Sequence, residues 1–236
     1  MNFLRVTSYE ALSQRAADLI AAQILLKPDC VLGLATGSTP IGAYQALVQK
    51  YQRSELDFSR VTTFNLDEYL GLRGDHPQSY RYFMNENLFR HVNLRPECTH
   101  VPDGCAADPA AYGADYDRAI AAHGGIDLQL LGIGNNGHIA FNEPGACFVR
   151  ETHAVTLKQS TIEANKRFFS SVEEVPTRAI TMGMGSIMLA RRVLLIADGP
   201  AKKEAVEKAF FGPICPEVPA SILQLHPDLT VICHVD

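Results

Sequence analysis

The amino-acid sequence predicts one α/β domain over residues 1–236, with a doubly wound, mostly parallel β-sheet and helices on both of its faces. Three observations predict this class. Short apolar runs rich in β-branched residues alternate with amphipathic helical stretches along the whole chain. A chain of 236 residues that is 47% hydrophobic is able to bury a core without disulfides or metals. No internal repeat, low-complexity tract or Gly/Ser-rich linker marks a second domain.

The first helix is expected at residues 9–26, where apolar side chains recur every three or four residues and Ser8 is available as an N-cap. The later helices are expected at 40–52, 78–91, 108–123 and 200–211. The strands are expected at 30–35, 61–66, 126–132, 178–183, 192–198 and 229–234. This alternation is Rossmann-like. The least regular stretch, broken by Gly and Pro, is the candidate for a mobile lid within residues 144–175.

The charges and the cysteines exclude several classes of protein. Lys and Arg number 21 against 26 Asp and Glu, and no basic run exceeds two residues, so no nucleic-acid-binding surface is expected. The six cysteines are scattered and form no C-x₂-C pair, which fits reduced thiols better than a zinc site or a disulfide scaffold. Neither an export signal nor an apolar stretch of membrane-spanning length occurs, so a cytoplasmic protein without membrane contact is expected.

Ligands of open parallel sheets bind beyond the carboxyl ends of the strands, where the chain turns into the next helix. The first such turn is Thr36-Gly37-Ser38-Thr39, followed by Pro40. Glycine permits close approach of the main chain to an anion, the hydroxyls donate hydrogen bonds, and a helix start offers unpaired N–H groups. The turn is therefore a candidate phosphate site, and an ordinary capped turn is an equally good interpretation of this motif alone.

The second turn carries two acids, Asp67 and Glu68, directly after a predicted strand. Leu66 and Tyr69 alternate with these acids and indicate a partly desolvated setting, which would raise the pKa of a carboxyl group. A helix cap or a solvated loop is the structural alternative. For Asp67, proton transfer is the favoured interpretation.

The third turn contains Gly132, Gly134 and Gly137 in the pattern G-x-G-x-x-G. A dinucleotide-binding fingerprint must open a long helix, and the Pro and Gly that follow this turn break any helix within a few residues, so the dinucleotide interpretation is weak. His138 and Glu143 of the same segment are a candidate imidazole–carboxylate pair for moving protons near neutral pH. A lone His is more often structural, but the Gly-rich setting favours function.

The fourth turn places Lys202 and Lys203 at the expected start of a helix. A cation there opposes the helix dipole, so an anionic ligand explains Lys202 better than helix stability does. For Lys203 a solvated surface position stays open.

Four motifs taken together, FNLDEYLGL, GNNGHIAFNEPG, ANKRFF and GPAK, resemble those of the glucosamine-6-phosphate deaminase family (glucosamine/galactosamine-6-phosphate isomerases) in order and spacing. The resemblance runs essentially end to end. It implies an amino-sugar-phosphate isomerase and hydrolase that converts glucosamine 6-phosphate into fructose 6-phosphate and ammonia during catabolism of sugars such as N-acetylglucosamine. It also implies that the enzyme needs neither a metal ion nor an organic cofactor.

The resemblance assigns roles to individual residues. Asp67 resembles the base that moves a proton between C2 and C1, and His138 the group that opens the pyranose ring. Glu143 would orient the imidazole and balance its charge. The implied phosphate clamp consists of the Thr36–Thr39 turn, chiefly Ser38 and Thr39, with Arg167 and Lys202.

Two departures from the family pattern bear on mechanism and regulation. Many members carry Asp where this chain has Asn136, so Asn136 is expected to support ring opening by hydrogen bonding and not by proton transfer. The longer, hexameric members are activated by N-acetylglucosamine 6-phosphate through basic residues, where this chain has His153 and Val155, and through a carboxyl-terminal extension beyond the position of Asp236. A monomer without allosteric activation is therefore expected.

Two rival functions remain open. A 6-phosphogluconolactonase-like hydrolase would share the anion turn and the N-G-H segment, but the motif around Asp67 favours aldose–ketose chemistry. A sugar-phosphate-sensing module of a transcription regulator would bind without turnover, and the absence of a DNA-binding domain and the presence of the candidate acid–base residues count against it.

Overall fold

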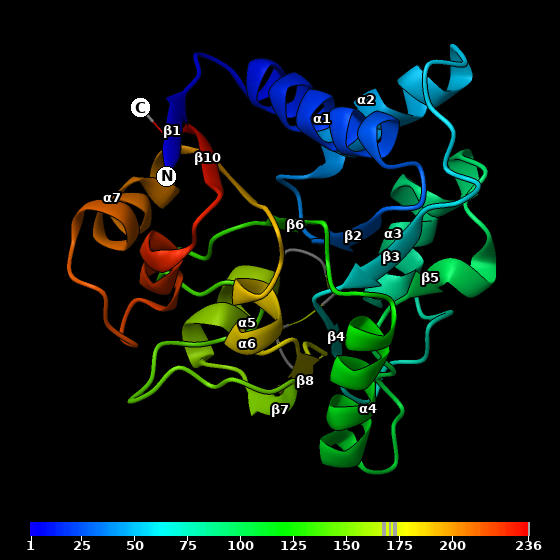
Figure 1. The fold of residues 1–236 in the computed structure, drawn as a ribbon. Coiled ribbons are helices and arrows are strands. Elements are labelled where there is room, and N and C mark those ends of the chain that lie inside the picture. The colour runs from blue at the N-terminus through cyan, green and yellow to red at the C-terminus, as the bar shows by residue number, and fades with distance from the viewer. Residues whose placement is uncertain (167–168, 170, 172–173, 236) are drawn as a thin grey trace.

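The structure is a computed structural model that describes residues 1–166, 169, 171 and 174–235. Its centre is a seven-stranded sheet with the order β1-β10-β9-β6-β2-β3-β5, in which every neighbouring pair is parallel (Figure 1). The strands are β1 (Asn2–Arg5), β2 (Val31–Leu34), β3 (Thr62–Asn65), β5 (Thr99–His100), β6 (Leu128–Leu131), β9 (Val193–Asp198) and β10 (Leu229–His234). Every residue of β2 and β6 is buried, as expected for strands covered on both faces.

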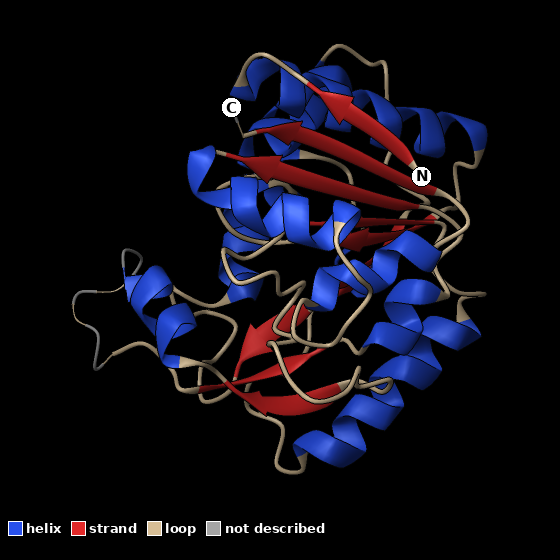
Figure 2. Ribbon diagram, turned by 90° about the vertical axis from the view of Figure 1, so that its left-hand side faces the viewer, coloured by secondary structure: helices blue, strands red, loops and turns tan. Residues whose placement is uncertain are grey.

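Helices cover both faces of this sheet (Figures 1 and 2). In Figure 1, α1 and α2 lie above the sheet, α4 and α6 lie below it, and α7 lies at the left, beside β1 and β10. The helices are α1 (Tyr9–Leu26), α2 (Ile41–Gln52), α3 (Tyr80–Asn87), α4 (Pro109–Ala122), α5 (Gln159–Asn165), α6 (Met184–Met188) and α7 (Lys203–Phe211), with short 3₁₀ turns at Phe89–His91, Pro96–Cys98, Pro200–Lys202 and Pro219–Leu225. None of the helices in the described part of the chain is long and apolar enough to cross a membrane.

The strand order places a topological switch point between β2 and β6. The chain runs from β2 outward through β3 to β5, then returns to β6 and continues through β9 to β10 on the other side. Because parallel crossovers are right-handed, the connections that follow β2 and β6 leave on opposite faces of the sheet. The turns after these two strands therefore diverge, and the gap between them is where ligands of such sheets bind.

A second sheet lies beside the first and has three antiparallel strands in the order β4-β8-β7 (Figure 2). Its strands are β4 (Asp67–Tyr69), β7 (His153–Thr156) and β8 (Arg178–Thr181). It has its own small apolar cluster of Tyr69, Phe141, Leu157, Ile162, Val175 and Ala179. The segment around Asp67, which the sequence predicts to be a turn, is thus a strand, and the run at 178–183 belongs to this sheet instead of the parallel one.

Most expected elements occur where the sequence predicts them. The bounds of α1 are confirmed, and the Ser8 hydroxyl caps it by accepting a hydrogen bond from the Ala11 N–H at 3.0 Å. The expected helix at 78–91 is shorter, because α3 ends at Asn87 and a 3₁₀ turn follows. Strands β1, β5 and β7, and helices α5 and α6, have no counterpart in the prediction.

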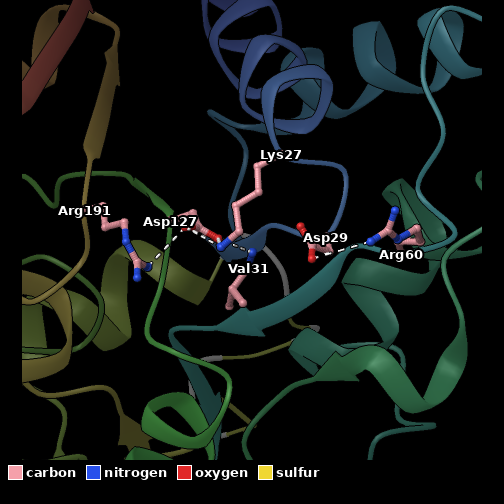
Figure 3. A network of polar contacts seen from close by, with 6 residues as sticks. All are labelled: Lys27, Asp29, Val31, Arg60, Asp127 and Arg191. Atoms are coloured by element: carbon pink, nitrogen blue, oxygen red, sulfur yellow. Dashed lines mark hydrogen bonds and ion pairs between the residues drawn. The ribbon is translucent and has the colours of Figure 1, made fainter.

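A charged network ties together the amino ends of the central strands, opposite the switch-point turns (Figure 3). Asp127, which is buried, precedes β6 and accepts hydrogen bonds from Lys27 Nζ at 2.9 and 3.0 Å and from Arg191 Nη1 at 3.1 Å. It also accepts the Val31 N–H at 2.8 Å, so one carboxylate joins the end of α1 to the starts of β2, β6 and β9.

Replacing Asp127 by Ala should lower the free energy of unfolding by about 1–3 kcal/mol, because the buried Val31 N–H loses its side-chain acceptor. Urea unfolding followed by circular dichroism measures this change. Asp29 is the matched control, since its ion pair with Arg60, at 3.6 Å, is exposed, and Asp29→Ala should cost less than about 1 kcal/mol. Equal losses in the two variants would contradict the structural role of Asp127.

Candidate active site

A cavity of about 1140 Å³ opens at the carboxyl ends of the parallel strands. Turns after β2, β3, β6 and β9 contribute to its wall, so four segments that are distant in the sequence meet here. The sequence-predicted residues that line it are Thr36, Gly37, Ser38, Thr39, Asp67, Asn136, His138 and Lys202. Glu143 lies behind His138 with 6% of its side chain exposed, and Arg167 lies outside the described residues.

The turn after β2 is held by Tyr9 from the first turn of α1. The Tyr9 hydroxyl accepts the Gly42 N–H at 2.9 Å and lies 3.2 Å from the carbonyl oxygens of Ser38 and Thr39. Gly37 has φ +98°, a conformation that few side chains tolerate. The turn is therefore pre-shaped before a ligand arrives. Tyr9 was expected only as an apolar position of a helix, and no pattern in the sequence marks its contact with a turn about 30 residues away.

Asp67 faces the cavity from β4, with 6% of its surface exposed. No residue that the structure describes donates a hydrogen bond to its carboxyl group, and the charge of Glu68 is adjacent. Burial, and secondarily the charge of Glu68, therefore raises the pKa of Asp67 well above the ordinary range of an aspartate. A carboxyl group in this state exchanges protons readily with a bound ligand.

Glu68 points away from the cavity and connects β4 to α3. Its Oε1 accepts the N–H groups of Tyr69 and Tyr80, both at 2.9 Å, and its Oε2 accepts the Arg81 N–H at 3.0 Å. Burial raises the pKa of Glu68 to about 7 against the opposing effect of these three donors. The neighbouring acids of the FNLDEYLGL motif thus have different tasks, since Glu68 anchors a helix start and leaves Asp67 in the cavity.

In the turn after β6, the imidazole ring of His138 packs directly against the main chain at Gly134. The Gly134 N–H donates to the His138 carbonyl oxygen at 2.8 Å, which closes a tight loop. A Cβ atom at Gly134 would lie 2.3 Å from the ring, so only glycine leaves room for it there. No helix follows this loop in the described residues up to 158, which agrees with the rejection of a dinucleotide-binding fingerprint.

Glu143 and Asn136 lie behind His138. Glu143 Oε2 lies 3.7 Å from His138 Nδ1 and accepts a hydrogen bond from Asn136 Nδ2 at 2.9 Å. Asn136 Oδ1 in turn accepts the His138 N–H at 3.2 Å, so Asn136 joins the main chain of His138 to the carboxylate. Burial raises the pKa of Glu143, but the nearby imidazole and its other hydrogen-bond donors outweigh burial and lower it to about 2. Glu143 is therefore an anion at any physiological pH.

Lys202 lines the cavity from the start of α7, next to Ala201 and Asp198. Asp198 ends β9 and pairs with His234 at the end of β10, with Oδ1 and Nδ1 2.8 Å apart. A lysine, an N-terminal helical turn and the Thr36–Thr39 turn thus face one cavity, an arrangement suited to an anion such as a phosphate group. The Asp198–His234 pair was not expected, because its partners lie 36 residues apart on separate strands.

Aromatic and polar side chains from α3, α5, the second sheet and the segment after β6 close the cavity. Tyr80 stacks on Phe141, with ring centroids 5.8 Å apart, and Tyr69 packs against both rings. Thr161 and Asn165 contribute from α5. Of these residues, only Tyr69 was named from the sequence as part of a site-forming turn. Phe141 and Asn165 lie within the motifs GNNGHIAFNEPG and ANKRFF but were given no role, and no pattern in the sequence marks Tyr80 or Thr161.

The chain matches over residues 6–231 the family described as glucosamine-6-phosphate isomerases/6-phosphogluconolactonase. The chain belongs to this family. A glucosamine-6-phosphate deaminase of Lachnoclostridium phytofermentans is 60% identical over 99% of each chain. A glucosamine-6-phosphate deaminase of Thermoanaerobacter pseudethanolicus is 53% identical over 98% of this chain and 92% of its own length.

A solved structure of a monomeric glucosamine-6-phosphate deaminase superposes with a TM-score of 0.97 at 46% identity, covering 99% of this chain and 97% of the other. Both relatives and this solved structure are glucosamine-6-phosphate deaminases, and the similarity to each of them runs along the full length of the chain. The doubly wound fold expected from the sequence is confirmed by this superposition.

Proposed function

We propose that the protein converts glucosamine 6-phosphate into fructose 6-phosphate and ammonia, in the catabolism of amino sugars. The observation that carries this proposal is the placement of Asp67 and His138 in the same cavity, with the anion-binding turn and Lys202 beside them. High identity to deaminases along the whole chain supports the same reaction.

Substrate binding begins at the phosphate group, which the Ser38–Thr39 turn and Lys202 hold away from the reacting carbons. Anchoring a remote group fixes C1 and C2 relative to the acid–base residues and removes orientational freedom before the reaction. The family resemblance implies that Arg167 also binds the phosphate group. This role stays a proposal, because Arg167 lies outside the described residues.

His138 opens the pyranose ring by taking the proton of the anomeric hydroxyl and giving a proton to the ring oxygen. The Glu143 carboxylate, 3.7 Å from Nδ1, stabilises the imidazolium that exists between these two transfers. Asn136 cannot ionise, so it contributes by holding Glu143 in place. The aldehyde produced at C1 then acidifies the proton on C2.

Asp67 removes the proton from C2 and returns it to C1, while the C1 oxygen takes up a proton and the nitrogen gives one up. C1 thus becomes a hydroxymethyl carbon and C2 an imine carbon. Water adds to the imine carbon, the C–N bond breaks, and ammonia leaves as the C2 ketone forms. Each of these steps is a proton transfer, an addition of water or the loss of ammonia, so neither a metal ion nor an organic cofactor is part of the proposal. Proton transfer by one well-placed side chain contributes about 10²–10⁴-fold to the rate.

A coupled assay for ammonia and fructose 6-phosphate, started with glucosamine 6-phosphate, tests the proposed function. A 6-phosphogluconolactonase would hydrolyse its lactone and release no ammonia, and a sensing module would bind glucosamine 6-phosphate without consuming it. Absence of both products at saturating substrate would overturn the proposal.

Replacing Lys202 by Ala should raise KM for glucosamine 6-phosphate about 10- to 100-fold and leave kcat at saturation nearly unchanged, because a charge-assisted contact to the phosphate group is lost. Steady-state kinetics measures both constants. The matched control is Lys203→Ala, since Lys203 is the next residue in the chain but does not line the cavity. An unchanged KM in the Lys202 variant would remove this side chain from the phosphate site.

The proposal includes a monomeric, cytoplasmic enzyme without activation by N-acetylglucosamine 6-phosphate. The Val155 side chain packs on the small apolar cluster, and His153 Nδ1 lies 2.8 Å from the Glu151 carbonyl oxygen, so β7 presents no Lys or Arg at these positions. All six cysteines are free thiols, which fits a reducing compartment. Light scattering tests the monomeric state by giving the mass of the protein in solution. A sigmoidal substrate curve that becomes hyperbolic when N-acetylglucosamine 6-phosphate is added would contradict the absence of activation.

We further propose that the lid consists of β7 and α5, within residues 144–175. One face of α5 lines the cavity, so outward movement of this helix would open the site to substrate. Hydrogen exchange of the α5 amide groups, with and without phosphorylated ligand, tests this motion. Identical exchange in the two states would argue against it.

A further inference from the structure

Helix α5 contacts both halves of the proposed acid–base machinery. At its start, the Lys158 N–H lies 3.3 Å from Glu143 Oε1. At its end, Asn165 Nδ2 donates a hydrogen bond at 2.8 Å to the hydroxyl of Tyr69, two residues beyond Asp67. Between these contacts Thr161 lines the cavity on the same helix. The helix therefore bridges the turn that carries His138 and the strand that carries Asp67.

The hydroxyl group of Thr161, midway between these two contacts, is buried and has no hydrogen-bond partner among the described residues. The residue is 3% exposed, and its main-chain N–H already donates to the Lys158 carbonyl oxygen at 2.9 Å. Its hydroxyl lies near enough to Glu143 to lower the pKa of that carboxyl group, but it makes no well-formed hydrogen bond with any residue in the described part of the chain. Buried hydroxyls without a partner are uncommon and require a functional explanation.

A second buried polar atom near Glu143 also lacks a hydrogen-bond partner. His138 Nδ1 has no hydrogen-bond partner among the described residues, because its separation of 3.7 Å from Glu143 Oε2 exceeds hydrogen-bonding distance. A carboxylate offers about four acceptor sites. Glu143 accepts from Asn136 at 2.9 Å and, over a longer distance of 3.3 Å, from Lys158, so acceptor capacity remains for both the Thr161 hydroxyl and an imidazole N–H.

We propose that Thr161 is a positioning residue: its hydroxyl donates to Glu143 and turns that carboxylate onto Nδ1 of His138 during turnover. The inference deepens the proposed function and rests on it, since the Glu143–His138 pair is the proposed ring-opening group. In this proposal α5 does more than line the cavity, because the position of the helix sets the geometry of the Glu143–His138 pair.

The test replaces Thr161 by Val, which keeps the branched shape and removes the hydroxyl, and by Ser, which keeps the hydroxyl. Thr161→Val should lower kcat for glucosamine 6-phosphate about 10- to 100-fold, the usual effect of losing a hydrogen bond to a charged group, and leave KM unchanged. Thr161→Ser should recover most of kcat. Glu163→Ala is the matched control, because Glu163 lies on the exposed side of α5 and pairs with Gln159, and its kinetics should equal those of the wild type.

Binding is measured separately by calorimetry with 2-amino-2-deoxyglucitol 6-phosphate, a reduced analogue that has no ring to open. Its dissociation constant should be the same in the wild type and in Thr161→Val. A higher dissociation constant together with a raised KM would mean that Thr161 contacts the ligand directly. A kcat of Thr161→Val equal to that of the wild type would mean that the hydroxyl does not contribute to the reaction. Either result overturns the inference. Inactivity of the wild type itself would overturn the proposed function instead.

Discussion

Replacing Asp67 by Asn should lower kcat for ammonia release by about 10²–10⁴-fold while KM stays near the wild-type value. The amide has nearly the same shape as the carboxyl group, so the cavity and the phosphate contacts remain. It cannot accept the proton from C2, and therefore both isomerisation and deamination stop. A coupled assay gives kcat and KM, and exchange of the C2 hydrogen with deuterated solvent reports the proton transfer alone.

The pH dependence of the wild-type enzyme provides an independent check on Asp67. Burial raises the pKa of this carboxyl group, and a base must be ionised before it accepts a proton. Wild-type kcat should therefore fall as the pH drops through this raised pKa, at a higher pH than for an exposed aspartate. Normal turnover of Asp67→Asn at saturation, with weakened binding, would assign the residue to substrate recognition instead.

Replacing His138 by Gln should lower kcat and kcat/KM by about 10²–10⁴-fold, because ring opening loses its proton shuttle. Glutamine retains hydrogen-bonding ability and is comparable in length, but its amide group cannot take up a proton from the sugar and release it again. Stopped-flow measurement of aldehyde formation, in the presence of an aldehyde-trapping reagent, follows this first step.

The affinity for 2-amino-2-deoxyglucitol 6-phosphate serves as the control for His138→Gln, since this ligand is already open and needs no proton shuttle. Its dissociation constant should remain that of the wild type. A His138 variant that opens the ring at the normal rate would show that solvent performs this step and that the imidazole has another role.

The parts of the fold that the sequence predicted share one property: local pattern and burial agree. Helix α1 was predicted to the residue because its apolar spacing and the Ser8 cap both mark it. Strands β2 and β6 are buried along their full length and therefore appear as continuous apolar runs. Strand β1 was missed because it lies at the sheet edge with exposed ends, and β5 was missed because it has two residues.

The candidate site follows the same division. Gly-rich turns and acidic residues at strand ends mark Gly37, Asp67 and His138, because open parallel sheets bind ligands there. Tyr9, Asp198 with His234, and Thr161 carry no such mark, since each acts through contacts with residues about 20 to 40 positions away. Side chains of these types are more often structural, and only their neighbours distinguish them.

The sequence by itself determined the alternation of strands and helices, the turns that carry polar residues, and the resemblance to the deaminases, because these depend on residues close together in the chain. Only the tertiary structure decided that Asp67 lies on a strand of a second sheet, that Glu68 turns toward α3, and that α5 touches Glu143. The physical reason is that strand pairing and side-chain direction depend on partners supplied by distant segments. An apolar run such as Arg178–Thr181 fits either sheet until its neighbours are in place.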